Sequence, residues 1–210
     1  MSATLRMTVE ATTHRQTDGR LRMKTKDTGN ILHDGELEAQ RRFCRGRTAE
    51  NDAQIAAMVQ MIQDHIRPSW IEFLESQPFF FLASANQYGA CDCSFRGREY
   101  TIAGTPTPLL KVLNPKVVVF PDYSGNNLYN SLGNILVNPH VGMLFVDFQK
   151  RSRARVNGSA EIVEDPNAYS HIWPRALRYV RVTVEQAYPN CKARIPIMMP
   201  APLTDVFFDE

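Results

Sequence analysis

Hydrophobic and polar positions divide the chain into a polar beginning and a longer segment with regular apolar spacing. Residues 1–50 carry many charges and few large apolar side chains, so they cannot bury enough surface to form a core alone. We interpret them as an N-terminal polar arm. From Asn51 onward, apolar residues recur at intervals of three and four, which is the spacing of one helix face. The folded domain is therefore expected to span residues 51–210.

Two helices are expected at the start of this domain. The first follows from an apolar stripe made of Ile55, Met58, Val59, Ile62 and Ile66. Asn51 or Asp52 is expected to cap it, and Pro68 interrupts the stripe because proline is excluded from helix interiors. Residues 70–74 then predict a second short helix that leads to Pro78.

After Pro78 the pattern is typical of short β-strands separated by turns. Residues 79–85 form a continuous apolar run, which predicts a strand buried on both faces. The next segments predict strands over 90–95, 109–113, 116–121, 141–148, 153–163 and 177–184. Helices are expected over 128–137 and from Asp165 to Trp173, with Gly158 at a bulge or bend. Such a series of strands indicates a small antiparallel barrel.

Composition narrows the classes of function. Lys and Arg total 24 against 22 Asp and Glu, and this balance supplies no basic surface for nucleic acid. The four cysteines match neither a disulfide framework nor a four-ligand zinc site, so we expect reduced thiols and no metal. Cys91 and Cys93 are expected on one strand face, as small buried packing residues. No apolar run approaches the ~20 residues of a membrane span, and no secretory signal is visible, so a cytoplasmic protein is expected.

Candidate chemistry is concentrated where a predicted strand passes into a predicted helix. The polar loop Asp122–Asn127 would bring backbone N–H groups, a hydroxyl and amides together, where an anion such as phosphate is favoured. Such a loop by itself is more often a capped turn. Arg96, followed by Gly97, could add a bidentate phosphate contact, and Lys111 could add a point charge, although surface ion pairs are commoner for single basic residues.

Taken in order, these segments resemble the pyridoxamine 5'-phosphate oxidase-like family of split barrels, in a branch distinct from the true pyridoxamine phosphate oxidases. The motifs are Ser94-Phe95-Arg96-Gly97, the Asp122–Asn127 loop with its Gly-Asn pair, and Ser-Leu-Gly-Asn-Ile at 131–135. The resemblance covers about residues 78–192 and implies a mainly β (α+β) fold, a six-stranded antiparallel split β-barrel with flanking helices.

The resemblance also implies a cofactor, flavin mononucleotide (FMN), bound at the interface of a homodimer. The residues implicated around it are Ser94, Arg96, Gly97, Lys111, Tyr123, Ser124, Asn126 and Asn127. Arg153 and Arg155 could reach the flavin from a neighbouring strand, and salt bridges on the barrel face explain them equally well.

The expected function is that of an FMN-dependent oxidoreductase, which transfers a hydride between the flavin and a small molecule, with reduced nicotinamide as a possible donor. The sequence shows no acid–base pair, so the catalytic residues are unassigned. Tyr123, Tyr129 or Trp173 is expected to stack on a substrate. Vitamin B6 oxidation is not expected, because segment 197–208 lacks the Trp- and Arg-containing ending of the true oxidases. The alternatives are a non-catalytic flavin- or haem-binding carrier or sensor, and a deazaflavin-dependent reductase.

Overall fold

The computed structural model describes residues 31–44, 46, 48–101 and 103–199. The chain divides between residues 45 and 46 into two units. The described part of the first unit contains helix α1 (Asp34–Phe43), an element that the sequence pattern did not predict. The His33 ring caps this helix by accepting from the backbone N–H of Gly35 and of Glu36. No residue of α1 is buried, so the helix contributes no core.

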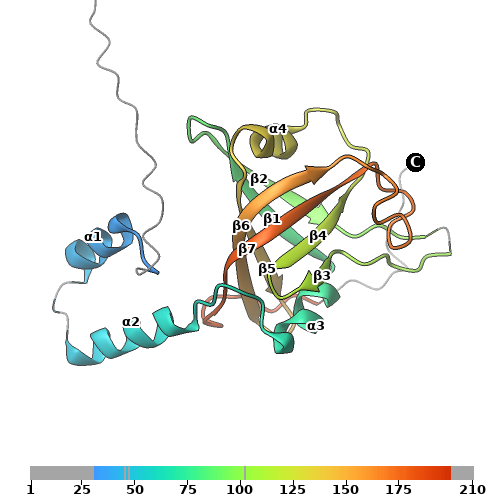
Figure 1. Ribbon diagram of the computed structural model, residues 1–210. Helices are drawn as coiled ribbons and strands as arrows, with labels where there is room; N and C mark the ends of the chain where they lie inside the picture. Colours follow the sequence, from blue (N-terminus) through green and yellow to red (C-terminus); the bar gives the residue numbers. More distant parts are fainter. Residues whose placement is uncertain (1–30, 45, 47, 102, 200–210) are drawn as a thin grey trace, which may run out of the picture. The chain divides into compact units, whose positions relative to one another are not determined.

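The second unit is built on one antiparallel sheet that curves into a split barrel (Figure 1). Its strands follow the order β2-β1-β5-β6-β7-β4-β3. Their bounds are β1 (Phe79–Ala85), β2 (Cys91–Gly97), β3 (Lys111–Asn114), β4 (Val117–Asp122), β5 (His140–Asp147), β6 (Ser152–Val163) and β7 (Arg178–Asn190). The split-barrel prediction is confirmed, but the described residues form seven strands rather than six. The short strand β3, which pairs with β4 alone, extends the sheet.

Three helices accompany this sheet in the described residues: α2 (Ala49–Met61), α3 (Pro68–Ser76) and α4 (Asn130–Val137). Helix α4 packs against β1, β2 and β6 at one end of the barrel, and α3 contacts β3 near the other end (Figure 1). The cap of α2 is Thr48, whose hydroxyl accepts from Asn51 N–H, and not Asn51 or Asp52 as expected. The helix ends at Met61, so Ile62 and Ile66 of the predicted stripe lie beyond it.

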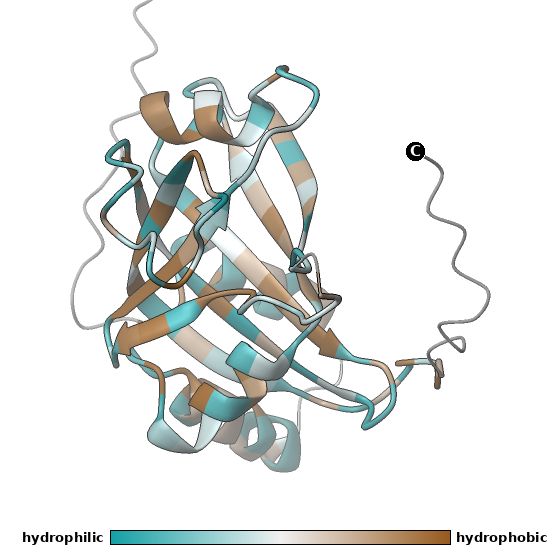
Figure 2. Ribbon diagram, turned by 90° about the vertical axis from the view of Figure 1, so that its right-hand side faces the viewer, coloured by the Kyte–Doolittle hydropathy of each residue, from teal (hydrophilic) through white to brown (hydrophobic). Residues whose placement is uncertain are grey.

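Alternating residues of the strands build the core inside the barrel. Along β1, Phe80 and Leu82 are buried, whereas Phe79 and Phe81 are half-buried and Ala83 is exposed. The expectation of a strand buried on both faces was therefore wrong, because no described element of this unit covers the outer face of β1. Figure 2 shows the same alternation of brown and teal or pale residues along the strands. Cys91 and Cys93 do share one face of β2, but both are exposed rather than buried.

A second, smaller core lies against the outer face of β4 and β7. Here the fully buried Trp173 packs with Val119 and Tyr179, and its Nε1–H donates to the carbonyl of Pro108 over 2.6 Å. The Tyr179 hydroxyl donates to the carbonyl of Pro166. The segment from Asp165 to Trp173 consists of turns rather than the expected helix, since these contacts hold it against the sheet. Trp173 is therefore a core residue and not the expected substrate-stacking residue.

Gly158 lies at an irregularity of the β6–β7 ladder, as the sequence indicated. A Cβ atom at this position would stand 2.1 Å from the carbonyl oxygen of Thr183. Glycine is required here because the neighbouring backbone approaches too closely for any side chain. Among the described residues, no helix is long and apolar enough to span a membrane.

Candidate functional site

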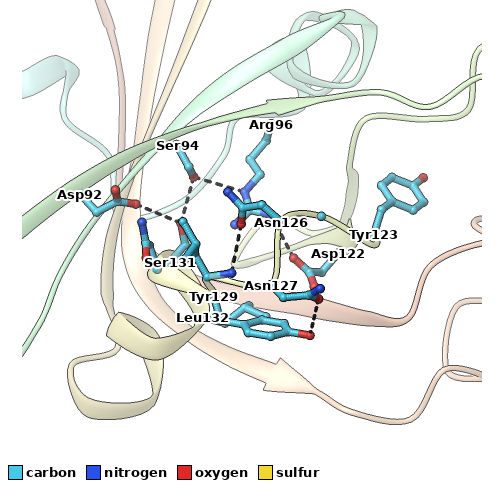
Figure 3. Close-up of a pocket in the computed structure, with 13 residues that line it drawn as sticks. Asp92, Ser94, Arg96, Asp122, Tyr123, Asn126, Asn127, Tyr129, Ser131 and Leu132 are labelled. Carbon is cyan, nitrogen blue, oxygen red and sulfur yellow. Dashed lines mark hydrogen bonds and ion pairs between the residues drawn. The ribbon is translucent and has the colours of Figure 1, made fainter. Parts of the chain in front are cut away.

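A polar cavity of about 200 Å³ opens between the end of β2, the loop after β4 and the start of α4 (Figure 3). Strand alternation positions its first wall, since Asp92, Ser94 and Arg96 lie at every second position of β2 and are half-buried. The remaining wall consists of Asp122, Tyr123, Gly125, Asn126, Asn127, Leu128, Tyr129, Asn130, Ser131 and Leu132. Segments far apart in the sequence thus converge on one space.

Arg96 is the cation of this cavity. Its Nη1 donates to Oδ1 of Asp122 over 3.0 Å, and its Nε donates to the hydroxyl of Ser94 over 3.3 Å. Asp122 is buried, and the Arg96 side chain is largely shielded from water. An ion pair in such surroundings is held more firmly than a surface pair, because solvent screens it less.

Ser131 connects the start of α4 to β2. Its hydroxyl lies 2.9 Å from the hydroxyl of Ser94 and 3.3 Å from Oδ2 of Asp92. Helix α4 begins after Tyr129, which adopts a left-handed conformation at φ 54° and provides no side-chain cap. The N–H groups of its first turn therefore add positive partial charge beside the cavity without a capping side chain to satisfy them.

The loop between β4 and α4 is shaped by its own asparagines. Oδ1 of Asn126 accepts from the N–H of Leu128, and Oδ1 of Asn127 accepts from the hydroxyl of Tyr129. Asn127 has φ 62°, a left-handed conformation that asparagine tolerates better than most residues. These contacts use the amide oxygens, so the Nδ2 ends of both side chains remain as donors for a ligand.

The structure brings together five of the predicted residues: Ser94, Arg96, Tyr123, Asn126 and Asn127 all line the cavity. Figure 3 shows Tyr123 at the edge of the group with its ring pointing away from Ser94 and Ser131. Burial raises the pKa of the Tyr123 phenol. Gly97 ends β2 beside this wall, and Ser124 lies in the loop without lining the cavity.

The other three predicted residues are engaged elsewhere. Nζ of Lys111 lies 2.7 Å from Oε2 of Glu75 on α3. Arg153 and Arg155 alternate with the core residues of β6 and therefore lie on its outer face. There, Arg153 contacts the sulfur of Cys191, and Arg155 stacks over the ring of Tyr188. A contact between these three residues and a bound flavin stays a prediction.

The residues around the cavity that sequence reasoning missed include Asp92, Asp122, Ser131 and Arg178. Asp92 carried a usable signal, since it precedes Ser94 by two positions and must share its strand face. Asp122 and Ser131 stood in the quoted motifs but were not selected. Arg178 carried no such signal, because only the pairing of β4 with β7 places it beside Asp122.

The cavity offers hydrogen-bond donors for an anion. The guanidinium, the hydroxyls and the amide N–H groups suit phosphate, while the two carboxylates of the lining, Asp122 and Asp92, are hydrogen-bonded to Arg96 and Ser131. No histidine or cysteine lines the cavity, and the described residues contain no group of three metal-ligating side chains. The donor set accordingly fits the phosphate of a nucleotide-like cofactor.

Fold and site together define an antiparallel split-barrel protein with a polar cavity between β2 and α4. Residues 66–193 match the family model described as pyridoxamine 5'-phosphate oxidase. Since this match covers more than half of the chain, the protein belongs to that family.

Solved structures of similar fold come from several bacteria. HupZ from Group A Streptococcus is 15% identical, with 60% of this chain and 99% of that chain covered and a TM-score of 0.46. An FMN-binding protein from Syntrophomonas wolfei is 8% identical, covering 75% and 98%, with a TM-score of 0.44. General Stress Protein 26 from Bacillus anthracis is 16% identical, covering 58% and 91%, with a TM-score of 0.40. No curated protein matches the sequence.

Proposed function

We propose that this protein is a homodimeric FMN-dependent oxidoreductase that acts on a small molecule. The observation that carries the proposal is the half-buried Arg96 guanidinium, surrounded by the donors of Ser94, Ser131 and the Asn126–Asn127 loop. A phosphate monoester satisfies these donors because it offers several strong acceptor oxygens and a negative charge. Family membership supports the same choice. The motifs of this cavity are the ones that resemble the family, and that resemblance implied a flavin.

Within this proposal, each part of the cavity has a binding role. Arg96 contacts the phosphate, and Ser94 and Ser131 offer hydroxyl donors. The side-chain amides of Asn126 and Asn127 donate from the loop between β4 and α4. When bound, the flavin supplies hydride transfer, and the protein binds and orients it. Gly97 and Ser124, which flank the lining residues, belong to the proposed site. Catalytic residues stay unassigned: the two carboxylates that line the cavity, Asp92 and Asp122, are hydrogen-bonded to Ser131 and Arg96.

The proposed dimer is supported by a partly exposed aromatic face on β1, β2 and the turn after β5. This aromatic face consists of Phe79, Phe81, Phe95 and Phe148. The ring of Phe95 is stacked on Phe79 at 5.0 Å between centroids, yet 62% of Phe95 is exposed. Clustered aromatic side chains on a surface are typical of protein interfaces, and a second copy would remove them from water. The proposed flavin site is shared between subunits.

Mass spectrometry of the cofactor released from the native protein tests the proposal. FMN is expected. A deazaflavin would support the reductase alternative, bound haem would support the carrier alternative, and a protein that neither contains nor takes up any flavin would contradict the proposal. If FMN is found, anaerobic bleaching of its visible absorption by reduced nicotinamide favours an enzyme, whereas an oxidised flavin that no donor reduces favours a carrier or sensor.

A further inference from the structure

One carboxylate in the polar cavity holds two guanidinium groups. Asp122 ends β4 and Arg178 begins β7, and the two are direct cross-strand partners. Oδ1 of Asp122 accepts from Arg96, while its Oδ2 lies 3.7 Å from Nε of Arg178. Asp122 is only 6% exposed, and it joins Arg96 of β2 to Arg178 of β7, two strands that are not neighbours in the sheet.

Arg178 is restrained from a second side as well. Its guanidinium lies 5.4 Å from the ring centroid of Tyr129, which lines the polar cavity. Arg178 also lines an adjoining cavity of about 510 Å³ together with Tyr129 and Leu132, which are shared by the two cavities. Its side chain, 27% exposed, is therefore placed at the junction of the two spaces.

The donors of this cluster can take an anion. Arg96 and Arg178 share the carboxylate of Asp122, while the second carboxylate of the cavity, Asp92, lies on the other side, against Ser131. Each guanidinium carries five N–H donors, and Asp122 occupies only part of them. Without the carboxylate between them, the two cations would repel each other and their long side chains would regain freedom.

We propose that Asp122 is a positioning residue that holds Arg96 and Arg178 as a clamp of two guanidinium groups, with Arg178 as the second cation for the ligand's phosphate. This inference rests on the proposed function, since it takes the ligand to be a phosphate monoester. Simple Coulomb repulsion predicts that removing Asp122 strengthens phosphate binding, whereas positioning predicts that it weakens binding. The two explanations thus predict opposite changes in phosphate affinity when Asp122 is removed.

Titration of the flavin-free full chain with FMN and with riboflavin, which lacks the phosphate, tests the clamp. Arg178→Gln is expected to weaken FMN binding roughly ten- to hundredfold, the range for a charge-assisted hydrogen bond, and to leave riboflavin binding unchanged. Arg178→Lys should fall between Gln and Arg, because lysine keeps the charge without the planar fork. The matched control is Arg181→Gln on the same strand, whose partner is the exposed Glu161 and whose FMN affinity should not change.

Asp122→Asn decides the positioning role. It is expected to weaken FMN binding although it removes a negative charge; unchanged or tighter binding would overturn the role. If this variant does not fold, Asp122→Glu separates the two explanations in another way: it keeps the charge, so Coulomb repulsion alone predicts unchanged binding, but it displaces the carboxylate. Weaker FMN binding is then expected, and wild-type affinity would overturn positioning.

Failure of the clamp can be told apart from failure of the proposed function. If the wild-type chain binds neither FMN nor inorganic phosphate, the proposed function fails and the clamp with it. If the wild-type chain and Arg178→Gln bind FMN equally well, the clamp alone is wrong.

Discussion

At the scale of the residue, Arg96 combines a structural contact with an expected binding contact. Its ion pair with the buried Asp122 fixes the side chain, and the hydroxyls of Ser94 and Ser131 extend the same network. A guanidinium that is already oriented loses little conformational freedom when it takes a ligand.

Replacing Arg96 with alanine should weaken FMN binding by about 1.5–3 kcal/mol for each charge-assisted hydrogen bond that the guanidinium makes to the phosphate. Flavin fluorescence titration measures the change, with riboflavin as the ligand that lacks the phosphate. An Arg96→Ala protein that retains FMN as firmly as the wild type would remove Arg96 from the site.

Gly158 gives a second prediction at this scale, one of stability. Gly158→Ala places a methyl group against the Thr183 carbonyl, so the free energy of unfolding should fall by about 1–3 kcal/mol, the range for overpacking. Chemical denaturation followed by circular dichroism measures it. Gly133→Ala in α4 is the matched control, since nothing lies within 4 Å of its added Cβ, and it should be neutral or slightly stabilising.

At the scale of the element, the connection between α2 and α3 is attached to two parts of the barrel. Gln63 exchanges backbone hydrogen bonds with Ala187 of β7, and the N–H of Ile66 donates to the carbonyl of Pro115. Beside them, Nζ of Lys116 pairs with the carboxylate of Asp64. The β3–β4 turn is thus linked to the connection by a charge pair.

This charge pair predicts an acid-dependent contribution to stability. Hydrogen bonds from Lys116, and then from His65, lower the pKa of Asp64 from 3.8 to about 2. A carboxyl with a lower pKa in the folded state stabilises the fold above its ordinary pKa, and this contribution disappears as the pH falls from about 4 to about 2. Melting temperatures of wild type and Asp64→Asn should therefore differ slightly near neutral pH and converge in acid; a constant difference would assign the effect to packing.

At the scale of the whole molecule, the aromatic face is an apolar surface that a partner would bury. Phe79 and Phe81 alternate with the core residues of β1, so the same strand supplies the barrel interior and the outer apolar surface. Burying such side chains is favourable in proportion to the apolar area removed from water.

A charge placed on this face should separate the proposed dimer. Phe95→Lys is expected to convert a dimer into a folded monomer, because burying an unpaired lysine at a closed interface is strongly unfavourable. Light scattering after size-exclusion chromatography measures the mass. Tyr88→Lys is the control, an exposed aromatic in the turn before β2 that lies outside the aromatic face. A wild-type monomer, or a Phe95→Lys dimer, would contradict the proposed interface.

Strand positions were largely predictable from the sequence, and the candidate site partly so. The motif around Arg96 and the Gly-Asn loop before α4 are local patterns, and their resemblance to the family implied Ser94, Arg96, Asn126 and Asn127, which the structure places around one cavity. The resemblance implied Lys111 as well, as a point charge for phosphate; in the structure it pairs with Glu75 of α3, and its contact with a flavin stays a prediction. The charge of a residue does not predict which group, distant in the sequence, will pair with it in the fold.

The sequence by itself predicted a small antiparallel barrel, the positions of most strands and helices along the chain, and the local chemistry of the loop after β4, because periodicity and turn chemistry act over a few residues. Tertiary structure alone decided that Trp173 is buried, that the apolar outer face of β1 is left uncovered by the described elements of its unit, and that Arg178 stands beside Asp122. These facts depend on which strands pair and what covers them. Pairing joins residues that are far apart in the chain, so no local pattern records it.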